Sequence, residues 1–217
     1  MEKFTARDLN AALWAAADEM RKVMSADAYK DYLLGLVFYK ALSDKMLVEA
    51  YELLDDDEKK PESLEEAQAV YEKALTDGSW EALSQELQDR FGCVIFPRFT
   101  FTAFYKQIND RTFMLSNLRQ AFRDIEAASG HAYEGLFEDF DVDSKDLGKT
   151  PDKRNEMIAS VIKALAHINL SDYSEDALGD AYEYLISQFA SESGKKAGEF
   201  YTPQSVSQII ARCPMTI

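Results

Sequence analysis

The chain has 217 residues, of which 47% are hydrophobic and 29% charged, a composition typical of a soluble globular protein with one substantial core or two small ones. The formal net charge of −15 argues against a general nucleic-acid-coating role, because phosphate binding requires clustered lysine and arginine. The two cysteines, Cys93 and Cys213, lie far apart and no signal-peptide pattern opens the chain, so we expect a reducing cytoplasm. The most apolar stretch, Tyr32 to Leu42, is too short to span a bilayer, and we expect no membrane insertion.

The N-terminal quarter of the chain has helical periodicity. A capping pair, Thr5 and Asp8, precedes an amphipathic run that predicts a first helix to Met24. A second apolar run begins at Tyr29, includes Lys40 on its broad face, and predicts a helix that continues to Leu54. The stripe of the first predicted helix is Leu9, Leu13, Ala17, Met20 and Met24.

The middle of the chain alternates between helix signals and breakers. Pro61 suits the first turn of a third helix, which Asp77-Gly78 should end, and a short helix from Trp80 to Leu87 should stop at Gly92. Residues 93–104 contain Pro97 among apolar and β-branched residues. They predict an irregular or short-strand segment packed on helices.

Helical spacing resumes in the C-terminal half. We expect a helix from Phe113 that closes at Gly130, a short amphipathic piece over residues 133–140, and a polar connector over residues 141–148. Thr150-Pro151 predicts a capped helix, and Ser174 opens another that Gly194 should end. No internal repeat is present, so the pattern predicts a mainly α, bundle-like fold.

The sequence lacks a complete catalytic signature. It contains no Gly-x-Gly turn, the feature that brings backbone amides close to a dinucleotide or adenosyl cofactor. His131 and His167 lie in separate segments without metal-ligand spacing, and we interpret both as structural. We therefore predict no metal site and no complete nucleotide-type catalytic site within these residues.

The basic residues are unevenly distributed. Residues 91–123 carry five basic groups against one acidic group, Asp110, within an otherwise acidic chain. If these side chains share a face, they can contact DNA or another subunit, whereas the alternative is a set of solvated helix faces. The five residues of this basic island are Arg98, Lys106, Arg111, Arg119 and Arg123.

A second candidate site lies near the C-terminal end of the sequence. Thr202 can cap a helix whose first position is Pro203, and such a helix start offers free amides to an anion. Phe200 and Tyr201 can wall a pocket beside it, although an ordinary helix start with core aromatics accounts for the same residues. The full candidate set is Glu199, Phe200, Tyr201, Thr202, Pro203 and Gln204.

The stretch Gly-Glu-Phe-Tyr-Thr-Pro at residues 198–203 closely resembles a motif of N6-adenine DNA methyltransferases, specifically of modification subunits of type I restriction-modification systems. Residues 179–196, residues 32–44, and the segments 136–141 and 147–148 are also similar to that family. The resemblance implies a helical N-terminal domain, which we place at residues 1–170. Residues 171–217 would then be a lead-in helix and the start of a Rossmann-like methyltransferase domain.

The resemblance also implies a function. Such subunits methylate adenine N6 in double-stranded DNA with S-adenosylmethionine, and residues 199–204 would contact this cofactor, with Thr202 near its methionine part. The implied partners are a specificity subunit, a second modification subunit and a restriction subunit. The later glycine-rich and Asn-Pro-Pro-aromatic motifs of the family are missing, so we expect a catalytically incomplete N-terminal fragment, either expressed as such or encoded by a truncated gene. The rival hypothesis is a stand-alone helical adaptor that binds a protein and meets neither DNA nor cofactor.

Overall fold

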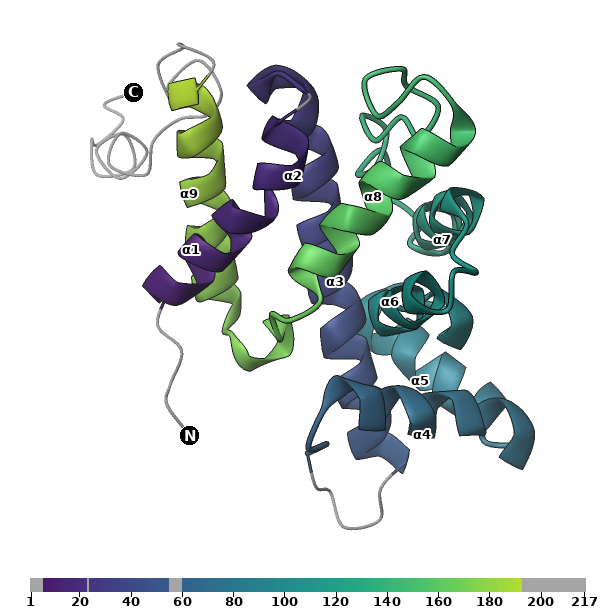
Figure 1. The fold of residues 1–217 in the computed structure, drawn as a ribbon. Coiled ribbons are helices and arrows are strands. Elements are labelled where there is room, and N and C mark those ends of the chain that lie inside the picture. Colours follow the sequence, from purple (N-terminus) through teal and green to yellow (C-terminus); the bar gives the residue numbers. More distant parts are fainter. Residues whose placement is uncertain (1–5, 23, 55–59, 193–217) are drawn as a thin grey trace, which may run out of the picture.

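The structure, a computed structural model, describes residues 6–22, 24–54 and 60–192. Within these ranges the chain forms α-helices joined by turns and two short 3-10 helices, and no strand occurs among them, which confirms the predicted mainly α class (Figure 1). The elements are α1 (Ala6–Ala16), α2 (Asp18–Arg21), α3 (Ala26–Leu54), α4 (Leu64–Asp77), α5 (Trp80–Phe91), η1 (Pro97–Phe99), α6 (Phe101–Asn109), α7 (Leu115–Ala128), α8 (Pro151–Leu165), η2 (Leu170–Asp172) and α9 (Glu175–Glu192).

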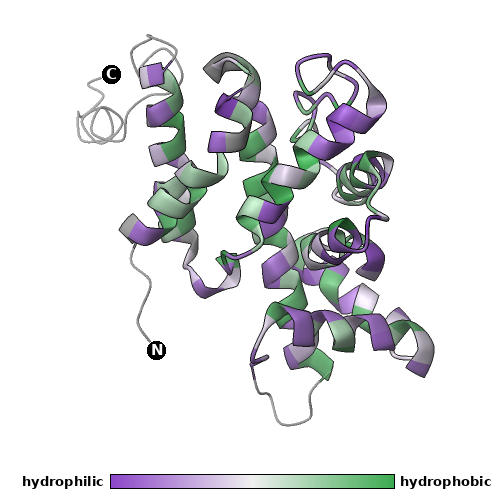
Figure 2. Cartoon of the chain, in the orientation of Figure 1, coloured by the Kyte–Doolittle hydropathy of each residue, from purple (hydrophilic) through white to green (hydrophobic). Residues whose placement is uncertain are grey.

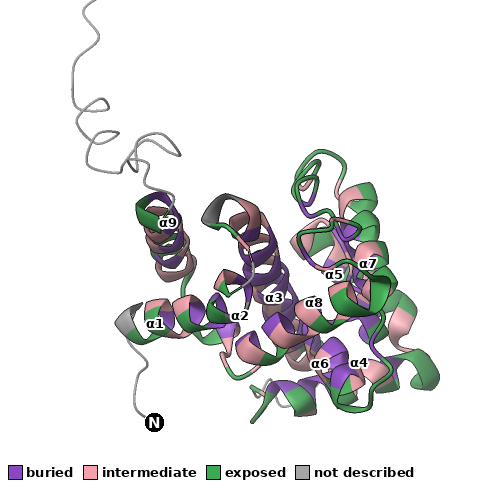
Figure 3. Cartoon of the chain, turned by 45° about the horizontal axis from the view of Figure 1, so that its top comes forward, coloured by how far each residue is buried: buried purple, intermediate pink, exposed green. Residues whose placement is uncertain are grey.

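Helix α3 is the central element of the fold. Helices α4, α5, α6, α8 and α9 all contact it, and buried positions follow it along its length (Figure 3). Leu33, Leu36 and Leu47 have no exposed surface, because α3 has neighbours on several sides. The apolar sides of the surrounding helices turn toward this core (Figure 2). None of the described helices combines the length and hydrophobicity needed to cross a bilayer.

Local capping chemistry places several helix ends where the sequence predicts them. Gly78 and Gly92 end α4 and α5 with φ of 89° and 72°, a left-handed conformation that glycine adopts without a Cβ clash. The Thr150 hydroxyl accepts a hydrogen bond from the Lys153 N–H and caps α8, with Pro151 at its first position. The predictions at Gly78, Gly92 and Thr150-Pro151 are therefore confirmed.

Other boundaries differ from the prediction. The first predicted helix is divided at Ala17 into α1 and α2. Pro61 precedes its helix, because Ser63 is the N-cap and accepts from the Glu66 N–H at 3.1 Å. Residues 133–140 form turns in which Phe137 and Phe140 are buried. The predicted caps or ends at Thr5 and Gly194 lie outside the described residues.

The predicted extended segment over residues 93–104 is wrong in its second half. Helix α6 begins at Phe101, and no strand forms in this part of the described chain. The Thr100 side chain accepts from the Ala103 N–H, and the Ser43 hydroxyl of α3 accepts from the Phe101 N–H at 2.8 Å. These two bonds satisfy two of the free amides of the first turn, which favours a helix over a run of aromatic and β-branched residues.

Helix α9 packs on α1 and α3, which brings the last described helix against the first (Figure 1). Phe189 lies at its centre, with its ring 6.0 Å from that of Trp14 and 5.3 Å from that of Tyr29. Ala181 and Leu185 are buried on the same face. The proposed domain boundary after residue 170 stays a prediction, but the helix beyond it is part of the same packed core.

Candidate functional site

The candidate cofactor residues Glu199, Phe200, Tyr201, Thr202, Pro203 and Gln204 lie outside the described residues. The helix that precedes them, α9, is held at its C-terminal end by polar contacts. Arg21 pairs with Glu192 at 3.1 Å, and the Tyr29 hydroxyl donates to the other oxygen of the same carboxylate. Burial and this contact together raise the pKa of Tyr29 well above its usual value. These contacts therefore anchor the C-terminal end of α9 to α2 and α3.

The five residues of the basic island are placed on different elements. Arg98 lies in η1, where its guanidinium stacks over Phe99 at 4.6 Å and Phe96 at 5.4 Å. Lys106 is exposed on α6 and Arg123 is exposed on α7. Neither of the two forms an ion pair with any described residue. Three members of the island line three different hollows: Arg119, Arg111 and Lys106.

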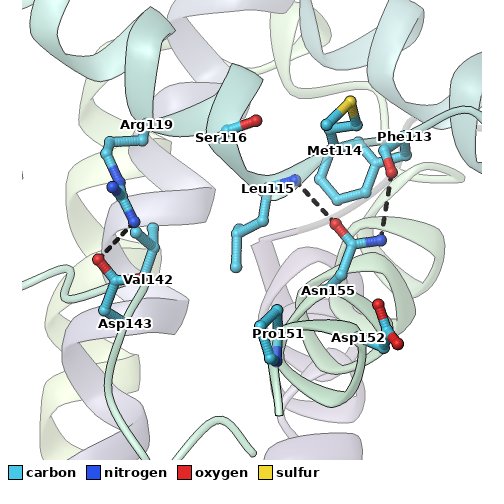
Figure 4. A pocket seen from close by; sticks show the side chains of 10 residues that line it. All are labelled: Phe113, Met114, Leu115, Ser116, Arg119, Val142, Asp143, Pro151, Asp152 and Asn155. Atoms are coloured by element: carbon cyan, nitrogen blue, oxygen red, sulfur yellow. Dashed lines mark hydrogen bonds and ion pairs between the residues drawn. The ribbon is translucent and has the colours of Figure 1, made fainter.

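Arg119 is already neutralised. Its guanidinium contacts the Asp143 carboxylate at 2.6 Å, across a hollow at the start of α7 (Figure 4). Asp152 lines the same hollow from α8. Because its basic group is paired and a second carboxylate is present, this hollow does not favour an anion.

Asn155 fixes the start of α7 from the neighbouring helix α8. Its Oδ1 accepts from the Leu115 N–H at 2.7 Å, and its Nδ2 donates to the Phe113 carbonyl at 3.2 Å (Figure 4). The N-cap residue of α7, Met114, contributes no side-chain bond of its own. The cap therefore comes from a residue distant in sequence, which local motif reasoning did not select.

Arg111 has an unusual backbone and an unexpected neighbour. Its φ is +59°, the left-handed region that a residue with a side chain rarely adopts, at the turn that follows α6. It lines a hollow between α6 and α8 together with Lys163, a residue that the sequence reasoning missed. Neither residue forms an ion pair with the described part of the chain. Lys163 gave no signal in the sequence, because the nearest lysine or arginine, Arg154, is nine positions away.

Among the described residues, no group of three or more histidine, cysteine, aspartate or glutamate side chains could hold a metal ion. His131 is exposed and contacts Glu134 at 2.7 Å. His167 packs its ring edge against Tyr105. Cys93 is buried and free, and burial raises the pKa of its thiol to about 11, as expected of an inert core thiol.

Known protein families match almost the whole chain. Residues 9–165 match the family described as HsdM N-terminal domain, and residues 173–215 match the family described as N-6 DNA Methylase. Among similar proteins, the type I restriction enzyme MpnII methylase subunit of Mycoplasma pneumoniae is 31% identical in an alignment 215 residues long, which covers 92% of this chain and 38% of that protein. The MjaIX methylase subunit of Methanocaldococcus jannaschii is 24% identical in an alignment 200 residues long, which covers 91% of this chain and 34% of that protein.

A solved structure has the same fold. The methyltransferase subunit of a type I restriction-modification system from Streptococcus thermophilus is 46% identical and aligns with a TM-score of 0.85, over 97% of this chain and 45% of that one. The chain thus spans less than half the length of these relatives. On the match over residues 9–165, the chain belongs to the family of type I restriction enzyme methylase subunits that carry the HsdM N-terminal domain.

Proposed function

We propose that the chain is the N-terminal part of a modification subunit whose complete form transfers a methyl group from S-adenosylmethionine to adenine N6 in DNA. The observation that carries this proposal is the order of the two matches. The match to the HsdM N-terminal domain ends at residue 165, and the N-6 DNA Methylase match begins at residue 173. Helix α9, which opens the second match, packs into the core formed by the first.

The helical part would serve assembly and DNA clamping. Its partners would be a specificity subunit, a second modification subunit, a restriction subunit and double-stranded DNA. The candidate cofactor residues begin at Glu199 and lie outside the described helices. Support for a contact role comes from the exposed basic residues Lys106, Arg111 and Arg123, which form no ion pair with the described residues, on a protein with a net charge of −15.

For the 217 residues alone we expect no methyl transfer, because the sequence contains no Asn-Pro-Pro-aromatic motif to hold a flipped adenine. The test is calorimetric titration of S-adenosylmethionine into this chain and into a form extended by the next ~250 residues, the size of a further domain. We expect the longer form to bind S-adenosylmethionine and the Thr202→Val variant of that form to lose this binding. The matched control is Thr76→Val, because Thr76 is an exposed threonine near the end of α4.

The rival function is a helical adaptor that binds a protein partner only. The net charge of −15 is the observation that favours it. The adaptor would be favoured if neither form bound S-adenosylmethionine in the titration and neither transferred a methyl group from labelled cofactor to duplex DNA.

A further inference from the structure

We propose that the groove between α6 and α8, lined by Arg111 and Lys163, binds phosphate groups of a DNA backbone. This Arg111–Lys163 groove has a volume of about 500 Å³, and its apolar floor is formed by Ile108, Phe113 and Ala159. The inference rests on the proposed function, because duplex DNA is the polyanion that a DNA methylase subunit meets.

Charge separates α6 and α8 from the other helices. Among the described α-helices, these two alone carry a net positive charge: α6 has Lys106 as its one charged residue, and α8 has three basic residues against two acidic ones. Helix α9, by contrast, carries five acidic residues and no basic one. Since α6 and α8 pack against each other, the two positive helices form one surface. A phosphate chain would meet the least repulsion there.

The basic groups of this groove are available to a ligand. Arg111 and Lys163 are both exposed and form no ion pair with the described residues. The one acidic residue in the lining, Glu156, contacts the Lys153 ammonium at 2.6 Å, which balances its charge. Asn155 and Ser160 already use their side chains within the protein. The phosphate contacts are therefore assigned to Arg111 and Lys163.

The backbone of Arg111 supplies a second, independent observation. Its φ of +59° costs a residue with a Cβ about 1 kcal/mol relative to glycine. Asparagine or glycine would satisfy the turn after α6 with less strain. Arg111 lines the groove with this backbone conformation, and residues held in sparsely populated backbone regions concentrate at ligand sites.

The experiment uses the 217-residue chain and a fluorescein-labelled 30-base-pair duplex, with anisotropy measured from 25 to 200 mM NaCl. The test variants are Arg111→Gly, Lys163→Gln and the double variant. Glycine suits the positive φ at residue 111, so the charge is removed without weakening the fold. The matched controls are Arg119→Gln, whose charge is already paired, and Lys73→Gln on the acidic helix α4. Circular dichroism and thermal melting verify folding.

We expect the double variant to bind at least tenfold more weakly at about 50 mM salt, and the slope of log K against log salt to fall by about 2. Two duplexes of unrelated sequence should give the same loss, since phosphate contacts carry no base information. Equal binding by all variants would overturn the inference and leave the methylase proposal intact. The same loss in the controls, or no binding by the unmodified chain at 25 mM salt, would also overturn it.

Two further outcomes separate the proposals. If the double variant binds DNA normally but no longer assembles with a specificity subunit, the groove is a protein-docking site and the phosphate assignment is wrong. If the groove behaves as expected while the extended chain fails to bind S-adenosylmethionine, the phosphate site stands and the methylase proposal fails.

Discussion

Lys40 and Asp44, one turn apart on α3, form an ion pair of 2.8 Å in which the two side chains are 1% and 0% exposed. The same carboxylate oxygen accepts the Leu170 N–H of η2 at 3.0 Å, and the Lys40 ammonium lies 4.7 Å above the Phe101 ring. The pair therefore joins the central helix to the start of α6 and to the segment that leads into α9. Burial raises the pKa of Asp44, and Lys40 opposes this shift.

Loss of the lysine should be costly. Lys40→Met leaves a buried carboxylate without its cation, and we expect the free energy of unfolding to fall by about 3–5 kcal/mol. The double variant Lys40→Met/Asp44→Asn should recover part of this loss, because no uncompensated charge remains. Urea denaturation of the two single variants, Lys40→Met and Asp44→Asn, and of the double variant measures the free energies of unfolding. Additive effects of the two substitutions would contradict the coupling.

At Gly35, side-chain packing decides whether a substitution by alanine stabilises or destabilises the fold. It lies within α3, and a Cβ built there would stand 2.9 Å from Cδ2 of the buried Phe140 ring. The clash should outweigh the gain in helix propensity, so Gly35→Ala should destabilise the fold by about 1–3 kcal/mol.

Gly179 provides the matched control for this substitution. A Cβ at Gly179, on α9, would meet nothing within 4 Å. Gly179→Ala should therefore stabilise the protein by about 0.5–1 kcal/mol. Thermal melting of the two variants should shift in opposite directions, and shifts of the same sign would show that propensity or strain alone decides.

Local chemistry explains which parts of the fold could be predicted from the sequence. The ends at Gly78 and Gly92 and the start at Thr150-Pro151 were predicted correctly because each depends on residues adjacent in the chain. The start of α6 was not, because one of its amides is satisfied by Ser43 on another helix. The amphipathic piece over residues 133–140 became turns whose aromatic rings still enter the core.

The basic island shows the same limit at the level of the site. Chain order placed Arg111 and Arg119 in one positive segment, but tertiary contacts pair Arg119 with Asp143 and set Arg111 beside Lys163. A count of charges along the sequence cannot reveal an ion-pair partner or a basic neighbour that comes from a distant segment. The candidate set Glu199 to Gln204 stays a prediction, since it lies outside the described residues.

Alkaline pH should unfold the protein through groups that are buried with their protons. Burial raises the pKa of the Cys93 thiol from its usual value near 9.0 to about 11, and that of Tyr182 to about 12. The stability that the thiol contributes is fully present below pH 9 and is lost as the pH rises through about 11. The urea midpoint should fall across this interval, and Cys93→Ala should remove part of the fall. A flat midpoint would contradict the shift.

The final prediction concerns Phe189, which is 1% exposed and attaches α9 to α1 and α3. Phe189→Ala should lower the free energy of unfolding by about 3–5 kcal/mol, because it leaves a cavity between Trp14 and Tyr29. Hydrogen exchange should accelerate in α9 more than in α5, since α5 does not depend on this contact. The exposed neighbour Ser191→Ala should leave both helices protected. Uniform acceleration across α5 and α9 would instead mean that α9 opens only when the whole core unfolds.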